Sequence, residues 1–133
     1  MRRLIAQILT VVSLPAISLP AAASETATLD EYLWTARPLV IFAPSEADPR
    51  LLQQLEWLEA EEAEMAERDV VVIVDVESGE ETPLRDQFHP RDFQILLIGK
   101  DGEVKLRKPF PWNVRELSRQ IDKMPMRRQE MAR

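Results

Sequence analysis

The residues best placed for chemistry in this chain of 133 amino acids are Ser45, Glu46 and Asp48. They follow the apolar run 38–42 and precede Pro49, so the sequence predicts a buried strand, a short loop and the first turn of a helix. A helix N-terminus offers free N–H groups and a partial positive charge, which favour an anion or developing negative charge. This strand–loop–helix corner is therefore the first place to look for a reactive group.

The chain contains no cysteine, and that absence excludes several chemistries at once. Thiol–disulfide exchange and thiol peroxidase activity need a cysteine thiolate at such a corner, and Ser45 cannot cycle through a disulfide. Disulfide bonds and cysteine-ligated zinc are excluded for the same reason. We therefore do not expect a thiol-disulfide oxidoreductase or a peroxidase.

Hydrolytic chemistry and metal binding have little support in the sequence. Ser45 lies where a hydrolase nucleophile would lie, but the Gly-x-Ser-x-Gly turn is absent and His89 is the only histidine. A metal site at His89 would need carboxylates such as Asp86 or Asp92, and a His-Pro pair in a loop is more often structural. Three glycines provide no phosphate-binding loop. We expect no catalytic residue, no metal and no cofactor.

One catalytic alternative stays open at this point. It is an enzyme of unrecognised type that uses Ser45, Glu46 or Asp48 together with Arg91 or His89 across the gap between two loops. Such an enzyme requires these side chains to converge on one pocket. If they serve binding instead, Ser45, Glu46, Asp48 and Arg91 form a candidate binding surface at the corner.

Charge is distributed unevenly along the chain. Residues 24–99 carry 5 basic and 18 acidic side chains, whereas residues 100–133 carry 10 basic and 5 acidic side chains. Either this polarity orients a charged partner or the two halves neutralise each other in the fold. The acidic balance of the chain disfavours nucleic acid as a partner. A second candidate binding surface, named here the basic face, comprises Lys105, Arg107, Lys108, Arg115 and Arg119.

The first 23 residues have the pattern of a secretory signal peptide. Arg2 and Arg3 precede the apolar segment Leu4–Ile17, and Ala21–Ala23 supplies small residues for cleavage. Cleavage after Ala23 predicts a periplasmic or secreted protein with no stable membrane insertion. An uncleaved membrane anchor is the competing interpretation, but two prolines interrupt a segment that is barely long enough to span a bilayer.

Apolar patterning predicts the elements that position the corner. Buried strands are expected at 38–42, 70–75 and 93–98, and an Asp-Gly turn leads to an antiparallel strand at 104–107. One helix is expected from Pro49 to about Glu67, and another from Asn113 to the residue before Pro125. We therefore predict one α/β domain at 24–126, followed by a frayed basic tail at 127–133. The element order predicts a thioredoxin-like, four-stranded mixed sheet of order 4-3-1-2, with strand 3 antiparallel and helices on both faces.

Several stretches together resemble domain-of-unknown-function family 4174. They are Leu29–Trp34, Arg37–Pro44, Asp69–Asp75, Leu97–Gly102, Lys105–Arg107, Trp112, Arg115–Leu117 and Ile121–Arg127. The resemblance covers nearly all of the chain after the signal peptide. It implies a thioredoxin- or peroxiredoxin-like fold and an exported protein, and it implies no activity because the family has no established one.

These observations favour an exported, cysteine-free binding or interaction module over an enzyme. The expected partner is an envelope or extracellular protein, or an anionic component of the envelope. The sequence places the candidate contacts at the corner and on the basic face.

The predicted cleavage site can be tested on the exported protein. Mass spectrometry should find Ser24 as the first residue, because signal peptidase cleaves after small side chains such as Ala23. The variant Ala23→Asp should accumulate as the longer precursor. An exported wild-type protein that keeps Met1 would contradict cleavage and favour the anchor.

Overall fold

A four-stranded mixed sheet forms the centre of the protein. The computed structural model describes residues 29–133, so the predicted signal peptide lies outside the described residues. The strands are β1 (Arg37–Ala43), β2 (Val70–Val76), β3 (Gln94–Ile98) and β4 (Val104–Lys108), in the order β2-β1-β3-β4. β1 pairs in parallel with β2 and antiparallel with β3, which pairs antiparallel with β4. The predicted strand order and the antiparallel third strand are confirmed.

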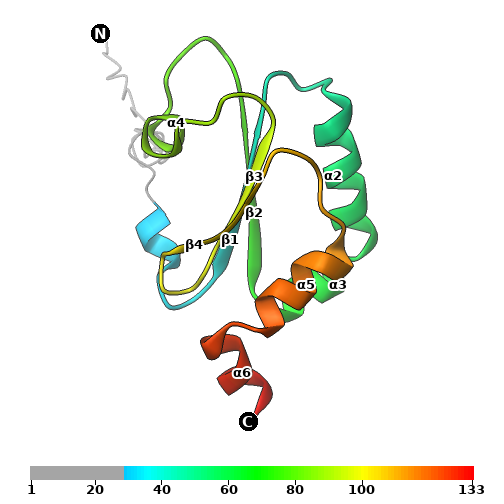
Figure 1. Cartoon of the computed structure of the whole chain (residues 1–133), viewed down its shortest axis with the longest axis vertical. Coiled ribbons are helices and arrows are strands. Elements are labelled where there is room, and N and C mark those ends of the chain that lie inside the picture. Colours follow the sequence, from blue (N-terminus) through cyan, green and yellow to red (C-terminus); the bar gives the residue numbers. More distant parts are fainter. Residues whose placement is uncertain (1–28) are drawn as a thin grey trace, which may run out of the picture.

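Helices cover both faces of the sheet (Figure 1). One face packs against α2 (Pro49–Ala60), α3 (Glu62–Glu67) and α5 (Val114–Asp122), and the other against α4 (Pro83–Phe88) and the 3₁₀ turn η1 (Leu29–Tyr32). None of the helices described between residues 29 and 133 is long and apolar enough to cross a membrane.

Strand β1 contributes to both hydrophobic cores. Its alternate side chains Leu39, Ile41 and Ala43 join the core under α2, α3 and α5, while Val40 and Phe42 join the core under α4. All seven residues of β1 are buried. Continuous apolar runs such as Leu39–Ala43 are typical of a strand that is covered on both faces.

Strand β2 lies at an edge of the sheet, as the predicted order places it, but it is less buried than we expected. We expected residues 70–75 to be buried on both faces, but Val72 and Val74 are 38% and 40% exposed. They are register partners of the buried Leu39 and Ile41, so they lie on the face that α2 and α3 cover. A run of β-branched residues predicts a strand but does not reveal which of its side chains the helices cover.

The predicted helix from Pro49 to Glu67 is two helices rather than one. At Glu61 the backbone leaves the helical region (φ −128°, ψ 45°), and α3 starts at the next residue. The break redirects the chain so that Met65 still reaches the core and Arg68 contacts α5.

The frayed tail that we predicted is instead a helix, α6 (Pro125–Met131). α5 ends at Asp122, three residues before Pro125, and the proline fits the first turn of a new helix because no N–H group is needed there. Arg127 and Glu130 anchor α6 through ion pairs. The tail is ordered because tertiary partners hold it, and local sequence alone does not show those partners.

The central ion pair of this anchor joins α6 to the start of β1. Arg37 is buried, and its guanidinium donates to both oxygens of Glu130 (Nη1–Oε1 3.3 Å, Nη2–Oε2 3.0 Å). The same carboxylate accepts a hydrogen bond from Lys100 (2.9 Å), which also contacts Asp69 (2.8 Å). Two buried cations thus share Glu130, and they lower its pKa to about 2 in spite of its partial burial.

A second cluster of ion pairs joins the acidic and basic parts of the chain. Asp122 of α5 accepts from Arg68 (3.0 Å) and from Arg127 (3.0 Å). Arg127 also contacts Glu67 at the end of α3 (3.2 Å). These contacts show that the two halves of opposite charge do neutralise each other at the junction of α3, α5 and α6.

Replacing Glu130 should destabilise the protein because it leaves Arg37 buried without its carboxylate. For Glu130→Gln we expect a loss of about 2–4 kcal/mol in the free energy of unfolding, measured by urea denaturation at pH 7. Glu116→Gln removes an exposed ion pair to Arg119 and should cost less than about 0.5 kcal/mol.

The stability difference between wild type and Glu130→Gln should depend on pH. Because folding lowers the pKa of Glu130, its contribution is present above the ordinary carboxyl pKa and is lost as the pH falls towards about 2. The two proteins should therefore converge in stability at low pH. An equal difference at pH 7 and pH 2.5 would contradict the role of this ion pair.

Candidate functional site

Asp48 at the corner serves the fold. It precedes α2, and its Oδ1 accepts a hydrogen bond from the backbone N–H of Arg50 (2.8 Å). The Arg50 side chain also donates to both oxygens of Asp48 (Nε–Oδ1 3.0 Å, Nη2–Oδ2 2.7 Å). The carboxylate is buried, and the hydrogen bonds from Arg50 lower its pKa. Asp48 is thus an ionised helix cap that has no free oxygen for a proton-transfer role.

Arg50 bridges the corner to the loop before β3, a role that the sequence did not reveal. Its guanidinium binds Asp92 (2.8 and 3.1 Å) and lies over the ring of Phe93, 5.3 Å from the ring centre. The contact with Arg50 lowers the pKa of Asp92. Two carboxylates that both lie near one arginine in space, although 44 residues separate them in the sequence, can be recognised only from the fold.

Ser45 and Glu46 are exposed and line a shallow hollow beside the C-terminal end of β2. Its lining comprises Pro44–Ala47 together with Val76–Ser78. Ser45 Oγ accepts from the backbone N–H of Ala47 (3.2 Å), the only hydrogen bond to this oxygen within residues 29–133. Neither His89 nor Arg91 lines the hollow. The convergence that the catalytic alternative requires is therefore not found there.

His89 and Arg91 lie elsewhere on the surface. His89 ends α4 in the left-handed conformation (φ 48°), and its backbone N–H donates to the carbonyl of Arg85 (2.8 Å). Arg91 is exposed in the loop before β3. In the described part of the chain, no group of three or more His, Asp or Glu side chains is arranged to hold a metal ion.

Arg85 closes the carboxyl end of the parallel strand pair, where open α/β sheets commonly bind ligands. Its guanidinium donates to the carbonyls of Ala43 (3.1 Å) and Asp75 (2.9 Å) and pairs with the Asp75 carboxylate (2.9 Å). It also lies 5.4 Å from the ring centre of Phe42. The side chain that fills this position comes from α4, so the sequence pattern of the strands did not predict it.

The residues of the basic face are partly engaged within the protein. Lys105 contacts Asp101 (2.8 Å) and Glu103 (3.2 Å), and Arg107 donates to the carbonyl of Phe88 (3.3 Å). Lys108 lies over the ring of Trp112, 4.8 Å from its centre, and Arg119 contacts Glu116 (3.4 Å). Arg115 and Arg119 are exposed and line one hollow together with the acidic residues Glu61, Glu64 and Asp122. Carboxylates within the protein therefore neutralise Lys105, whereas Arg115 and Arg119 keep an exposed positive charge on the basic face.

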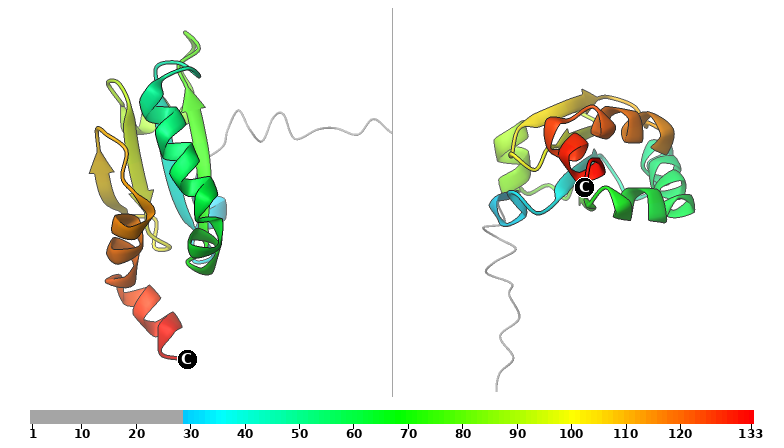
Figure 2. Two further views of the ribbon diagram at one scale, coloured as in Figure 1. Left: turned by 90° about the vertical axis from the view of Figure 1, so that its right-hand side faces the viewer. Right: turned by 90° about the horizontal axis from the view of Figure 1, so that it is seen from below.

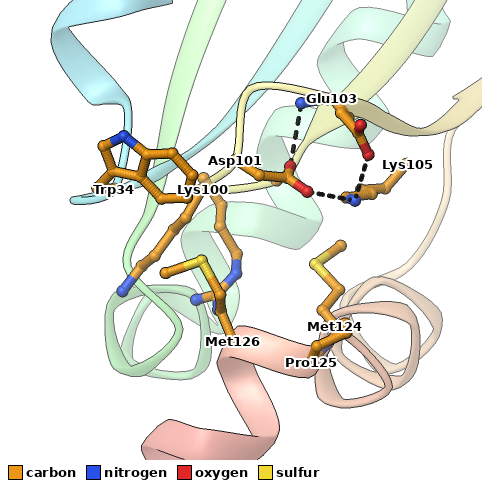
Figure 3. Close-up of a pocket in the computed structure, with 10 residues that line it drawn as sticks. Trp34, Lys100, Asp101, Glu103, Lys105, Met124, Pro125 and Met126 are labelled. Atoms are coloured by element: carbon orange, nitrogen blue, oxygen red, sulfur yellow. Dashed lines mark hydrogen bonds and ion pairs between the residues drawn. The ribbon is translucent and has the colours of Figure 1, made fainter.

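A further hollow of about 370 Å³, which we name the Trp34 hollow, lies between the start of β1 and the junction of α5 and α6. Figure 3 shows Trp34 on one side of this hollow and Met124 and Met126 on the other. Trp34 is 63% exposed and adopts a positive φ of 67°, a strained conformation for a bulky residue. Lys100 in its wall is already paired with Asp69 and Glu130.

Comparisons with known proteins agree with this fold. The profile of a family described as Domain of unknown function (DUF4174) matches residues 28–130. Coiled-coil domain-containing protein 80 of Danio rerio is 31% identical over 134 residues. That match covers 78% of this chain and 16% of the fish protein, so the chain spans about one sixth of that relative's length.

Solved structures with a similar fold include peroxiredoxins. The reduced 2-Cys peroxiredoxin of Plasmodium vivax has a TM-score of 0.61 at 15% identity, covering 77% of this chain and 84% of that one. Thioredoxin peroxidase I of Plasmodium yoelii has a TM-score of 0.55 at 17% identity, covering 76% and 79% respectively. At these identities the likeness shows a thioredoxin-like fold. This chain has no cysteine, whereas the Plasmodium vivax protein is named as a 2-Cys peroxiredoxin.

The structural role of Asp48 predicts a clear ranking of variants. Asp48→Ala removes the cap and the partner of Arg50, so it should lower the free energy of unfolding by about 1–2 kcal/mol. Asp48→Asn keeps the capping oxygen and should lose less. Urea denaturation at pH 7 measures both, with Glu46→Ala in the same exposed loop as a control expected within about 0.5 kcal/mol of wild type. A loss for Glu46→Ala as large as that for Asp48→Ala would contradict the assignment.

Proposed function

Because the chain belongs to the DUF4174 family, for which no activity is described, we propose from its site geometry that it is a non-catalytic binding module. It uses the thioredoxin-like fold as a scaffold and presents surfaces to a partner. The partner is an envelope or extracellular protein, or an anionic component of the envelope.

The observation that carries this proposal is the composition of the corner. The acidic group at the start of α2, Asp48, is a cap that is locked by Arg50, and Ser45 has no side-chain partner that would activate it within the described residues. A serine nucleophile needs an adjacent base, and within the described residues no side chain hydrogen-bonds to Ser45 Oγ. Arg85 fills the neighbouring end of the sheet. The charged side chains at the corner therefore support a structural role there.

Export completes the proposal. The signal-peptide pattern of residues 1–23 supports a mature chain that acts in the periplasm or outside the cell. A cysteine-free domain is compatible with an oxidising compartment because it has no thiol to be oxidised. The exposed Arg115 and Arg119 support an anionic partner as one form of the binding function.

The non-catalytic part of the proposal predicts that the purified chain has no thiol-type turnover. Neither peroxide consumption nor reduction of insulin disulfides should exceed the rate in buffer, because both reactions pass through a cysteine thiolate. A cysteine-containing peroxiredoxin and thioredoxin serve as positive controls. Turnover that co-purifies with the folded chain would overturn the proposal.

The anionic-partner form predicts binding to vesicles that contain phosphatidylglycerol. The double variant Arg115→Glu, Arg119→Glu should bind about tenfold or more weakly in co-sedimentation at low salt, since each surface cation contributes about 1 kcal/mol. The matched variant Arg128→Glu, Arg133→Glu has the same net charge and alters exposed residues of the C-terminal segment. Equal binding by the two double variants would show that the basic face is not the contact.

A further inference from the structure

The outer edge of β2 is an unprotected strand edge. β2 is seven residues long and pairs only with β1 among the strands that the structure describes. Figure 2 shows β2 and β4 at opposite edges of the sheet. The unpaired side of β2 presents backbone N–H and C=O groups at alternate positions, and the half-exposed Val72 and Val74 lie beside them.

The opposite edge shows how this fold protects a strand edge. β4 has five residues, three of them basic (Lys105, Arg107 and Lys108), and its pairing with β3 has an irregular register between Leu97 and Ile98. Short length, charged side chains and local irregularity are the usual devices that keep other chains from pairing with an edge strand. This protection also gives part of the basic face a role in the fold.

β2 has none of these devices. Its sequence Val-Val-Val-Ile-Val-Asp-Val contains no proline, no lysine and no irregularity in its register with β1. Its only charged residue is Asp75, whose carboxylate accepts hydrogen bonds from Arg85 (2.9 Å) and Thr82 (2.6 Å). A long, apolar, regular edge is either an aggregation hazard or a surface that another strand covers.

The charges around β2 indicate what kind of strand fits. Residues 56–81, which comprise β2 and the segments on both sides of it, hold eleven acidic side chains and one basic side chain, Arg68. Arg68 is buried against Asp122 and Glu64. Asp69 and Glu77 immediately flank the strand at its two ends. Asp69 pairs with Lys100 (2.8 Å) and Glu77 with Arg85 (3.2 Å), and both carboxylate side chains stay about half exposed. The edge therefore has an apolar centre and an acidic surround.

This charge pattern disfavours a second copy of the same chain. A two-fold axis through Ile73 would place Asp69 of one copy beside Glu77 of the other, together with two acidic segments of the same sign. Like charges that lie opposite each other across strands destabilise the pair. A strand with basic residues at its ends would instead place a cation opposite each of these carboxylates, and opposite charges across strands stabilise the pair.

We propose that the outer edge of β2 binds an extended segment of a partner protein by strand addition. The segment carries β-branched or other apolar residues at its centre and lysine or arginine at both ends. Its backbone pairs with β2, alternate apolar side chains cover Val72 and Val74, and its cations face the acidic flanks. This inference extends the proposed binding function to a partner class and to a surface distinct from the basic face.

A blocked nine-residue peptide, Lys-Lys-Val-Thr-Val-Thr-Val-Lys-Lys, is the probe. Titrated into the ¹⁵N-labelled full mature chain, it should produce saturable shifts centred on residues 70–76 and slower amide exchange there, with a Kd of about 0.1–1 mM. The same peptide N-methylated at its internal valines and threonines keeps its charge but cannot form a strand ladder. It should bind at least tenfold more weakly.

Variants on the two edges separate this site from general adhesion. Val72→Lys, Val74→Lys places cations at exposed positions of β2 and should weaken peptide binding at least tenfold, while thermal unfolding shows that the fold is kept. The control Val104→Lys adds one cation on the other edge strand, at a valine that is 43% exposed, and should leave binding unchanged.

Three results would overturn the inference. They are equal binding of the N-methylated peptide, shifts centred outside β2, and no saturable shift up to 5 mM peptide, which is well above the expected Kd. A wild-type dimer in sedimentation that the double Val variant disperses would instead assign the edge to a second copy. None of these outcomes depends on the vesicle or redox assays, so the binding-module proposal can stand or fail separately.

Discussion

Burial of the whole of β1 is the constraint on which the rest of the structure depends. A strand that is covered on both faces and paired on both sides leaves its backbone and side chains no access to water. Its first residue, Arg37, is charged, and a buried charge requires a partner. Glu130 supplies that partner from the far end of the chain, so the need of one strand for charge compensation also orders the last helix.

Charged groups also fix the corner that precedes α2. In a thioredoxin-like fold, the start of the first long helix is the position where a helix dipole can stabilise a thiolate. Here that dipole is matched by Asp48, and Arg50 extends the contact to the loop that precedes β3. Asp48, Arg50 and Asp92 are fixed by one another at this point, which stabilises the junction between the start of α2 and the loop before β3.

Charge also distinguishes the two edges of the sheet. Positive side chains on β4 and negative side chains around β2 come from the same uneven distribution that is visible along the sequence. Ion pairs at the junction of α3, α5 and α6 neutralise some of these charges, and the other charged side chains stay on the surface. Under the proposed binding function, these remaining differences in charge would help to select a partner.

The sequence by itself determined the strands, their order, the absence of cysteine and the cap at Asp48, because these follow from local patterns, composition and the connectivity rules of α/β folds. Tertiary structure alone decided the rest. It joined Arg37 to Glu130 across 93 residues, turned the expected tail into α6 and left Val72 and Val74 of β2 exposed. It also brought Arg85 to the end of the sheet. These are long-range contacts, and the free energy of burying a charge or covering a strand depends on neighbours that are distant in the sequence.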